Sequence, residues 1–536
     1  PPAQSYFYEH DLFALAFCEV ASCQRDAEAG CLKWGISEDN IRSSTYKVPA
    51  FTKVRLDARI KKSSRIPALG DPLTSIVLES EGERYEIEGD SEFDILRSLE
   101  KEVEKLDPDF VLTRGGDSFL FPYLVQRAQD AGCSLSLGRE KNMPLGRPAR
   151  QGVSYFSYGR IYYKPTATKL HGRVHIDTDN SFLIDASSIH GLCEVARLCR
   201  MPLHIASRAS IGKCLSSLQF YCAVKRGVLI PWKPSLPEHF KTFGELLVAD
   251  RGGFIFEPRT GVYEGVAELD FVSLYPSIIS QKNISAETVR CSCCPDSQER
   301  VPELGYNICE KKRGIVPEAI EIVIKKRAEY KKLQETAGDE KKSVYDARRE
   351  ALKWISVATF GYLGFNNAKF GRIDAHIAVC AFDRKILLEA TRIAEEQGFR
   401  VLHGIVDSLW VVRKGRPADE EDYSRLKERI EKETKFAISF EGVYKWIAFL
   451  QSKTDSQLPV ANRYFGAFRN GKLKIRGIEA RRHDTPPLFR RFQKEVLSVM
   501  AAGNTVEEVR HLMPAVRSVL DRYVELLRSG RVDAQD

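Results

Sequence analysis

Hydrophobic and polar residues follow two different periods along the chain. TSIVLES (74–80) and DFVLTR (109–114) are short apolar runs with β-branched residues, whereas EFDILRSLEKEVEKL (92–106) repeats its apolar residues at the spacing of one helix face. Strand and helix patterns that are mixed in this way predict an α/β domain over residues 53–225. Residues 1–52, which end near TYKVPAF, predict a smaller, β-rich piece.

A proline-rich stretch separates this domain from the rest of the chain. RGVLIPWKPSLPEHF (226–240) contains three prolines, which predicts a linker. The following patterns predict extended β structure over 252–271, a pair of helices over 316–368, a helix plus a hairpin over 374–450, and a basic C-terminal part. We find no internal repeat and no low-complexity tract.

Length and composition restrict the class of protein. At 536 residues the chain is too long for one hydrophobic core, so we expect three or more domains or subdomains. The composition, 43% hydrophobic and 29% charged, is typical of a soluble globular protein, and no stretch has the length and hydrophobicity of a membrane span or a secretory signal.

The net charge of +8 is compatible with a polyanionic partner if the positive charge is clustered. Lysine and arginine do concentrate in two stretches, 311–353 and 472–494. The alternative is that these runs are ordinary solvated helix faces.

Cysteine usage indicates a reducing compartment with mostly free thiols, since the thirteen cysteines follow no regular spacing. One group is dense: Cys291, Cys293, Cys294 and, after a gap, Cys309. The pattern CSCC is not a standard zinc-binding spacing. These cysteines could bind a metal, form disulfides or have neither role.

A single acid interrupts an apolar hairpin at HGIVDSLWV (403–411). The flanking segments are typical of two buried strands, and we expect Gly404 to supply the turn. Burying an unpaired carboxylate against such strands costs about 2 kcal/mol or more of folding free energy unless another group compensates its charge. Asp407 is therefore either a solvated turn residue, the commoner case, or a metal ligand that needs a second acid.

VAELDFVSLYPSII (266–279) supplies a second acid of the same kind. It predicts a strand that runs into Asp270, then a turn, then a helix with Pro276 in its first turn. If this strand lies beside the hairpin, Asp270 and Asp407 meet at one sheet edge. Two Mg²⁺ ions about 3.5–4 Å apart between such acids are a common device for phosphoryl or nucleotidyl transfer.

The helices between these two acids are rich in positive charge. Arg327 and Lys331 lie one helical turn apart, and Lys353 lies on the next helix. Three cations that face two metal-binding acids suit a nucleoside triphosphate. Taken singly, each residue also fits an ordinary solvated amphipathic helix.

At these positions the chain resembles the family B (α-like) DNA polymerases over nearly its whole length. DFVSLYPSII is similar to motif A, HGIVDS to motif C, and the helices with Arg327, Lys331, Lys353 and Gly361-Tyr362 to the fingers and motif B. NRYFG (462–466) and RGIEARRHDTP (476–486) resemble the palm-to-thumb segments, and RGGFIFEP (251–258) resembles the linker that contacts the template.

The resemblance implies an α+β multidomain fold, a right-hand polymerase with palm, fingers and thumb behind an N-terminal β-rich domain and a ribonuclease-H-like exonuclease-type domain. The implied boundaries are 1–52 for the N-terminal domain, 53–225 for the exonuclease-like domain, 226–315 for the linker and first palm part, 316–368 for the fingers, 369–455 for the second palm part and 456–536 for the thumb.

It also implies roles for single residues. The catalytic residues would be Asp270 and Asp407, which with the Phe271 carbonyl would bind two Mg²⁺ ions, for which Mn²⁺ can substitute. The dNTP would be bound by Ser273, Leu274, Tyr275, Arg327, Lys331 and Lys353, and Tyr275 would exclude a 2′-OH. The nascent base pair would contact Val357, Phe360 and Gly361, and the DNA would contact Gly252, Gly253, Arg463, Tyr464, Arg481 and Arg482.

The polymerase motifs depart from the family pattern at several positions. Ile405 replaces the first motif C aspartate, so we expect reduced catalysis. Val357, Ala358 and Phe360 replace polar groups of motif B, which predicts weaker selection of the correct base pair, and Asn462 replaces a lysine that contacts the primer.

The exonuclease motifs are eroded further. Asp57 is followed by Ala58 and Arg59 where an Asp-x-Glu pair is expected, Leu120 replaces the acid of the second motif, and no Y-x-x-x-D appears. A two-metal nuclease needs more than one acid, so we predict an inactive domain. This erosion resembles the archaeal second-paralogue group of the family.

The leading expectation is a DNA-templated DNA polymerase that is slow, does not proofread and tolerates damaged templates. The alternative is a catalytically silent scaffold that binds primer-template DNA. The expected partners are primer-template DNA, dNTPs and accessory replication or repair proteins, with no membrane, in a cytoplasmic, nucleoid-associated location.

Overall fold

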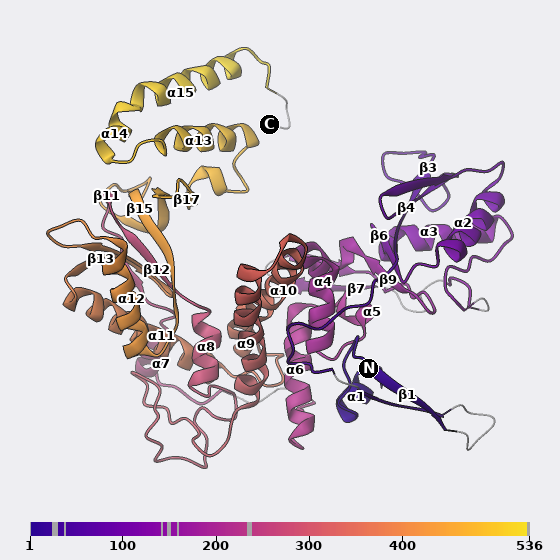
Figure 1. The fold of residues 1–536 in the computed structure, drawn as a ribbon, viewed down its shortest axis with the longest axis horizontal. Helices are drawn as coiled ribbons and strands as arrows, with labels where there is room; N and C mark the ends of the chain where they lie inside the picture. The colour runs from indigo at the N-terminus through magenta and orange to yellow at the C-terminus, as the bar shows by residue number, and fades with distance from the viewer. Residues whose placement is uncertain are drawn as a thin grey trace. The chain divides into compact units, whose positions relative to one another are not determined.

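The computed structural model describes residues 2–23, 31–36, 39–140, 143–146, 152–157, 160–232 and 238–532. The chain forms two compact units (Figure 1). The first comprises residues 1–234, 318–362 and 367–370, and the second 235–317, 363–366 and 371–536. The predicted fingers helices thus cluster with the N-terminal half of the chain, although they lie between two palm segments in the sequence.

The first unit contains a five-stranded sheet in the order β5-β4-β3-β6-β9. Its strands are β3 (Lys53–Ile60), β4 (Leu73–Ser80), β5 (Glu83–Ile87), β6 (Phe110–Thr113) and β9 (Val174–Asp177). The helices α2 (Glu92–Leu106) and α3 (Phe121–Asp130) follow, with a short π-helix at Gly116–Leu120. Helix α2 is capped by Ser91 and buries Ile95, Leu99 and Val103 in the core, as its apolar period predicts.

The remainder of the first unit is mainly helical. It contains α1 (Pro2–Glu9), the antiparallel pairs β1 (Cys18–Cys23) with β2 (Cys31–Ile36) and β7 (Val153–Ser157) with β8 (Arg160–Lys164), a 3₁₀ turn at Thr178–Asn180, and α4 (Phe182–Leu198), α5 (Leu203–Ala206) and α6 (Ile211–Lys225). The long helices α9 (Ile315–Thr336) and α10 (Asp339–Leu363) lie side by side, as their periodicity predicts (Figure 1). Residues 1–52 contain the helix α1 in addition to the predicted strands.

A buried charge network anchors α9 within the first unit. The carboxylate of Glu194 in α4 is fully buried and pairs with Lys326 Nζ at 2.7 Å. The hydroxyls of Tyr46 and Tyr330 each donate to Glu194 at 2.7 Å. Burial alone would raise the pKa of Glu194, but Lys326 and the two hydroxyls outweigh it and lower the pKa. The Arg348 guanidinium of α10 lies 3.9 Å from the Tyr46 ring centroid, so both helices are held through one polar cluster.

The second unit contains a sheet in the order β10-β13-β14-β12-β15-β16-β17, with β11 paired to β15. The strands are β10 (Ile255–Phe256), β11 (Gly261–Glu264), β12 (Ala267–Phe271), β13 (Phe399–Ile405), β14 (Ser408–Arg413), β15 (Ile438–Gln451), β16 (Pro459–Phe468) and β17 (Leu473–Arg476). The helices before the C-terminal segment are α7 (Phe243–Ala249), α8 (Leu274–Gln281), α11 (Ile373–Glu396) and α12 (Glu420–Thr434).

The C-terminal segment is helical and lies beyond the β11, β15 and β17 end of the sheet (Figure 1). It comprises a 3₁₀ turn at Glu479–Arg481 and the helices α13 (Pro487–Met500), α14 (Val506–His511) and α15 (Met513–Arg528). Within the described residues, no helix combines the length and the apolar character that a membrane crossing requires.

The predicted hairpin around Asp407 is confirmed, but the expected role of Gly404 is wrong. The turn is made by Val406, which has φ 50°, and Asp407, while Gly404 lies inside β13. A Cβ atom at Gly404 would lie 2.7 Å from the Phe256 ring of the neighbouring strand β10. This glycine is therefore required by close packing and not by the turn.

Candidate active site

The two predicted acids converge at the end of the central strands of the second unit. The register of β12 and β14 places Asp270 opposite Ser408. The Ser408 hydroxyl donates to Asp270 Oδ1 at 2.5 Å and lies 3.4 Å from Asp407 Oδ1. The Phe271 backbone N–H donates to the Asp407 carbonyl at 2.7 Å, which fixes the turn beside β12. The structure thus brings Asp270, Phe271 and Asp407 together around one hydroxyl.

The charge of these acids is poorly compensated. Burial and the charge of Asp407 raise the pKa of Asp270 to about 7, and burial raises the pKa of Asp407. Lys474 lowers the pKa of Asp407, but its ammonium is paired with Glu268. Close carboxylates without a cationic partner fit a divalent ion, and an oxygen-only ligand set suits Mg²⁺.

A third acid near this site, Asp383 in the middle of α11, was not predicted from the sequence. Its side chain is 0% exposed, and the backbone N–H of Phe254 lies near its carboxylate. Burial and the charge of Asp407 raise the pKa of Asp383 to about 8. The adjacent guanidinium of Arg384 pairs with Glu303 at 2.6 Å. An acid inside the apolar run AVCAFDRKIL was the available signal in the sequence.

The linker RGGFIFEP packs against these groups. Gly252 has φ +66°, and its carbonyl accepts a hydrogen bond from Arg384 at 2.7 Å. A Cβ atom at Gly253 would lie 2.9 Å from the Tyr275 hydroxyl and 3.1 Å from Asp383 Oδ2. The Val406 side chain approaches the same point to 2.9 Å. Only glycine fits here, so the linker, Tyr275 and Asp383 form one packed cluster beside the Asp407 turn.

Helix α8 begins directly after β12, as the strand–turn–helix pattern predicts. Ser273 precedes it in the left-handed conformation with φ 51°, and Leu274 is buried as its first residue. The helix N-terminus therefore lies next to Asp270 in the chain, and backbone N–H groups at a helix N-terminus favour phosphate.

The predicted DNA-contacting residues of the C-terminal part differ in exposure. The Arg463 guanidinium donates to the Gln451 carbonyl at 2.7 Å, and Arg481 and Arg482 are exposed. The ring of Tyr464 is buried in the sheet core, 5.2 Å from the Trp410 ring centroid, and is not presented to solvent.

The predicted triphosphate-binding residues lie on α9 and α10 of the first unit. Burial and Arg349 lower the pKa of Arg327, while the charge of Glu350 opposes this. Lys353 is exposed and pairs with Glu350 at 2.7 Å, so Arg327 and Lys353 both lie near one acid. Lys331 is exposed on α9.

The residues predicted to border the nascent base pair lie toward the end of α10. The Val357 side chain is 62% exposed, and Phe360 is half-buried. A Cβ atom at Gly361 would meet no atom within 4 Å. This part of the helix therefore presents an apolar side chain and a bare backbone to solvent.

The degenerate nuclease positions hold no ligand cluster in the described residues. On β3, Asp57 is exposed and accepts from the Ala58 N–H at 2.8 Å, while Arg59 pairs with Glu86 at 2.9 Å. Leu120 is buried in the core. Asp117 lies nearby and was not predicted from the sequence to have a role. It is buried and pairs with Arg208 at 2.6 Å, so its charge is already balanced in the core.

Family models match the C-terminal and the N-terminal parts of the chain separately. Residues 220–536 match the family model for DNA polymerase family B, and residues 56–186 match the model for its exonuclease domain. The DNA polymerase 2 of Saccharolobus solfataricus is 36% identical over 336 residues, which cover 63% of this chain and 49% of the relative. The DNA polymerase 2 of Aeropyrum pernix is 26% identical over 94% of this chain and 65% of its own length.

The chain thus spans between about half and two thirds of these relatives. The solved family B DNA polymerase of Pyrobaculum calidifontis shares the fold, with a TM-score of 0.66 and 21% identity over 99% of this chain and 73% of that chain. These matches confirm the resemblance and the fold class that the motifs imply, including relatives named as second polymerases. The chain belongs to DNA polymerase family B.

Proposed function

We propose that this chain is a DNA-templated DNA polymerase that adds dNMPs to a primer 3′ end by a two-metal mechanism. The observation that carries the proposal is the convergence of Asp270 and Asp407 on Ser408, with their charge uncompensated by any ion pair in the described residues. If Asp407 were an ordinary solvated turn residue, there would be no reason for Asp270 to lie beside it.

Asp270, Asp407 and the Phe271 carbonyl would hold two Mg²⁺ ions, for which Mn²⁺ can substitute. When bound, the ions would supply positive charge next to the primer 3′-OH and the triphosphate, as nucleotidyl transfer requires. Phosphate oxygens would bind the N-terminus of α8 at Ser273 and Leu274. Tyr275, held against Gly253, would lie under the deoxyribose and exclude a 2′-OH.

The fingers would complete the nucleotide site. Arg327, Lys331 and Lys353 would bind the triphosphate, since three cations suit four negative charges. Val357, Phe360 and Gly361 would border the nascent base pair with apolar groups. The DNA would contact Gly252, Gly253, Arg463, Arg481 and Arg482, whereas the buried Tyr464 would act by holding its strand in place.

The departures from the family pattern support slow and permissive synthesis. Ile405 leaves motif C with a single acid, and an apolar base-pair pocket discriminates less than one built on hydrogen bonds. The exonuclease-type domain would be structural, because Arg59 and Leu120 stand where ligands are needed. A chain of this kind would tolerate mismatched or damaged templates and would not proofread.

Asp383 would partly compensate for Ile405 by adding negative charge to the metal site and by positioning Tyr275. We expect Asp383→Asn to weaken Mn²⁺ binding, measured by electron paramagnetic resonance, about 10-fold, as outer-shell changes at metal sites commonly do. Glu389→Gln on the same helix is the control and should bind Mn²⁺ like the unmodified chain. If Asp383→Asn bound Mn²⁺ as tightly as the unmodified chain, Asp383 would not contribute to metal binding.

The second candidate is a polymerase-shaped scaffold that binds primer-template DNA without catalysis, which the loss of the motif C acid at Ile405 favours. Against it stands the cluster of Asp270, Asp407, Tyr275 and Asp383, because a scaffold has no physical need for buried, uncompensated acids.

Primer extension on a defined primer-template separates the two candidates. We expect extension with Mg²⁺ and Mn²⁺ and all four dNTPs, poor use of rNTPs, and similar extension on templates with and without a deaminated base. Without dNTPs, the primer 3′ end should not be shortened. DNA binding with no extension under either metal would favour the scaffold.

A further inference from the structure

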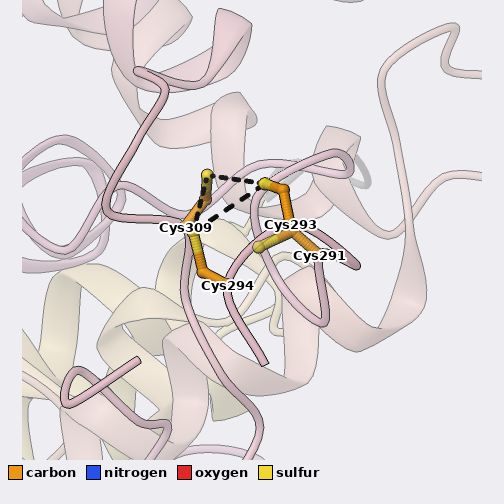
Figure 2. A group of neighbouring side chains, drawn as sticks. All are labelled: Cys291, Cys293, Cys294 and Cys309. Carbon is orange, nitrogen blue, oxygen red and sulfur yellow. Dashed lines mark hydrogen bonds between the residues drawn. The ribbon is translucent and has the colours of Figure 1, made fainter. Parts of the chain in front are cut away.

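The segment between α8 and α9 has almost no regular structure. Residues 282–314 contain only two isolated bridges, Val289 to Ile308 and Arg300 to Asn307. Within this segment the side chains of Cys291, Cys293, Cys294 and Cys309 point toward one another (Figure 2). A segment with so little helix or strand is commonly stabilised by a cross-link or a bound ion.

The sulfur positions match a tetrahedral ion site. The Sγ atom of Cys293 lies 3.8 Å from that of Cys294 and 3.6 Å from that of Cys309, and the Cys294 and Cys309 sulfurs are 3.8 Å apart. All four ligand atoms lie within 4.8 Å of one another. A disulfide requires about 2.05 Å. A tetrahedron with Zn–S bonds of about 2.3 Å has edges of about 3.8 Å, which these separations reproduce.

We propose that Cys291, Cys293, Cys294 and Cys309 bind a single Zn²⁺ ion as a tetrathiolate. Four thiolates at a single-ion spacing select a thiophilic metal of tetrahedral preference. An iron–sulfur cluster fits less well, because its four cysteines are divided among two or more irons, and cysteines on different irons lie farther apart than the ligands of one ion. Four protein ligands leave no open position, so the site is structural and not catalytic.

Backbone groups around the cysteines hold the candidate ligands in place. The backbone N–H groups of Glu310 and Lys311 donate to the Cys294 sulfur. The Asn307 amide donates to the carbonyls of Cys291 and Cys294, at 2.8 Å each, and so orients the first half of the site. Such outer contacts to ligating residues are typical of structural metal sites.

The ion would fix the chain where it passes into α9. Asn283 donates to the Cys309 carbonyl at 2.9 Å and accepts from the Gly314 N–H at 2.8 Å. Glu287 caps the first turn of α9 through the Ile315 N–H at 2.6 Å. Glu303 of the same segment pairs with Arg384 on α11. The site would thus hold the segment against the helix that carries Asp383.

Metal analysis of the purified, reduced chain tests this proposal without any activity measurement. We expect about one zinc per chain by mass spectrometry. After replacement by Co²⁺, we expect the absorption of a tetrahedral tetrathiolate. Cys309→Ser should lower zinc affinity at least 10-fold, while Cys133→Ser, a half-exposed cysteine of the first unit, should bind zinc like the unmodified chain.

Less than one tenth of an equivalent of zinc in the unmodified chain after incubation with excess Zn²⁺ would overturn the proposal, as would an iron–sulfur chromophore or disulfides among these cysteines. The metal content and Co²⁺ spectrum of the unmodified chain decide the outcome by themselves, even if Cys309→Ser loses the local fold.

Discussion

Asp270→Asn and Asp407→Asn are each expected to lower the rate of primer extension at least about 10³-fold, with little change in DNA affinity. Each change removes a charge that we propose to bind metal but keeps the shape of the side chain. Because Ile405 has already removed one family acid, no neighbouring motif C carboxylate is available to substitute for Asp407. Single-turnover extension with Mg²⁺ and Mn²⁺, together with a DNA-binding titration, measures both quantities.

The matched control is Glu428→Gln, an exposed acid on α12 of the same unit. It removes the same charge away from the candidate site and should extend primers at the unmodified rate. Extension that survives in both aspartate variants would refute the two-metal assignment. Loss of DNA binding together with extension would instead indicate damage to the fold, which circular dichroism would reveal.

Lys326→Met is expected to lower the free energy of unfolding of the first unit by about 3–5 kcal/mol. The change leaves the fully buried Glu194 carboxylate without its cation, while the hydroxyls of Tyr46 and Tyr330 still donate to it. Hydrogen exchange in peptides of α4 and α9, measured against denaturant, reports the loss where it occurs.

The neighbouring Lys325→Met is the control, because Lys325 is exposed and pairs with Glu321 one turn away. An exposed pair of this kind contributes little, so exchange should hardly change. Equal effects of the two substitutions would mean that burial of the Lys326–Glu194 pair carries no special stabilisation. Adding Glu194→Gln to Lys326→Met should recover part of the loss, since it removes the unpaired charge.

Local sequence patterns were sufficient for the elements that carry the candidate site. The apolar, β-branched runs around Asp270 and Asp407 and the helical period of α9 and α10 depend only on neighbouring residues, so strand, hairpin and helix pair could all be predicted. The motif around Tyr275 likewise predicted the family, which the family models confirm.

Contacts between distant segments could not be predicted in this way. The role of Gly404 depends on the Phe256 ring of another strand, and the burial of Tyr464 depends on Trp410. Helix periodicity singled out Arg327, whereas the buried partner of α4 is its neighbour Lys326. A helix pattern states which face is apolar but not which charged residue at its border will meet an opposite charge.

The sequence by itself therefore determined the family, the order of elements and the acids Asp270 and Asp407, because short-range periodicity and motif spacing encode them. Only the tertiary structure decided that Asp383 lies near enough to Asp407 to sense its charge and that the four irregularly spaced cysteines gather at the spacing of one ion. Both depend on how strands pair and loops fold back, which brings together residues that have no regular spacing along the chain.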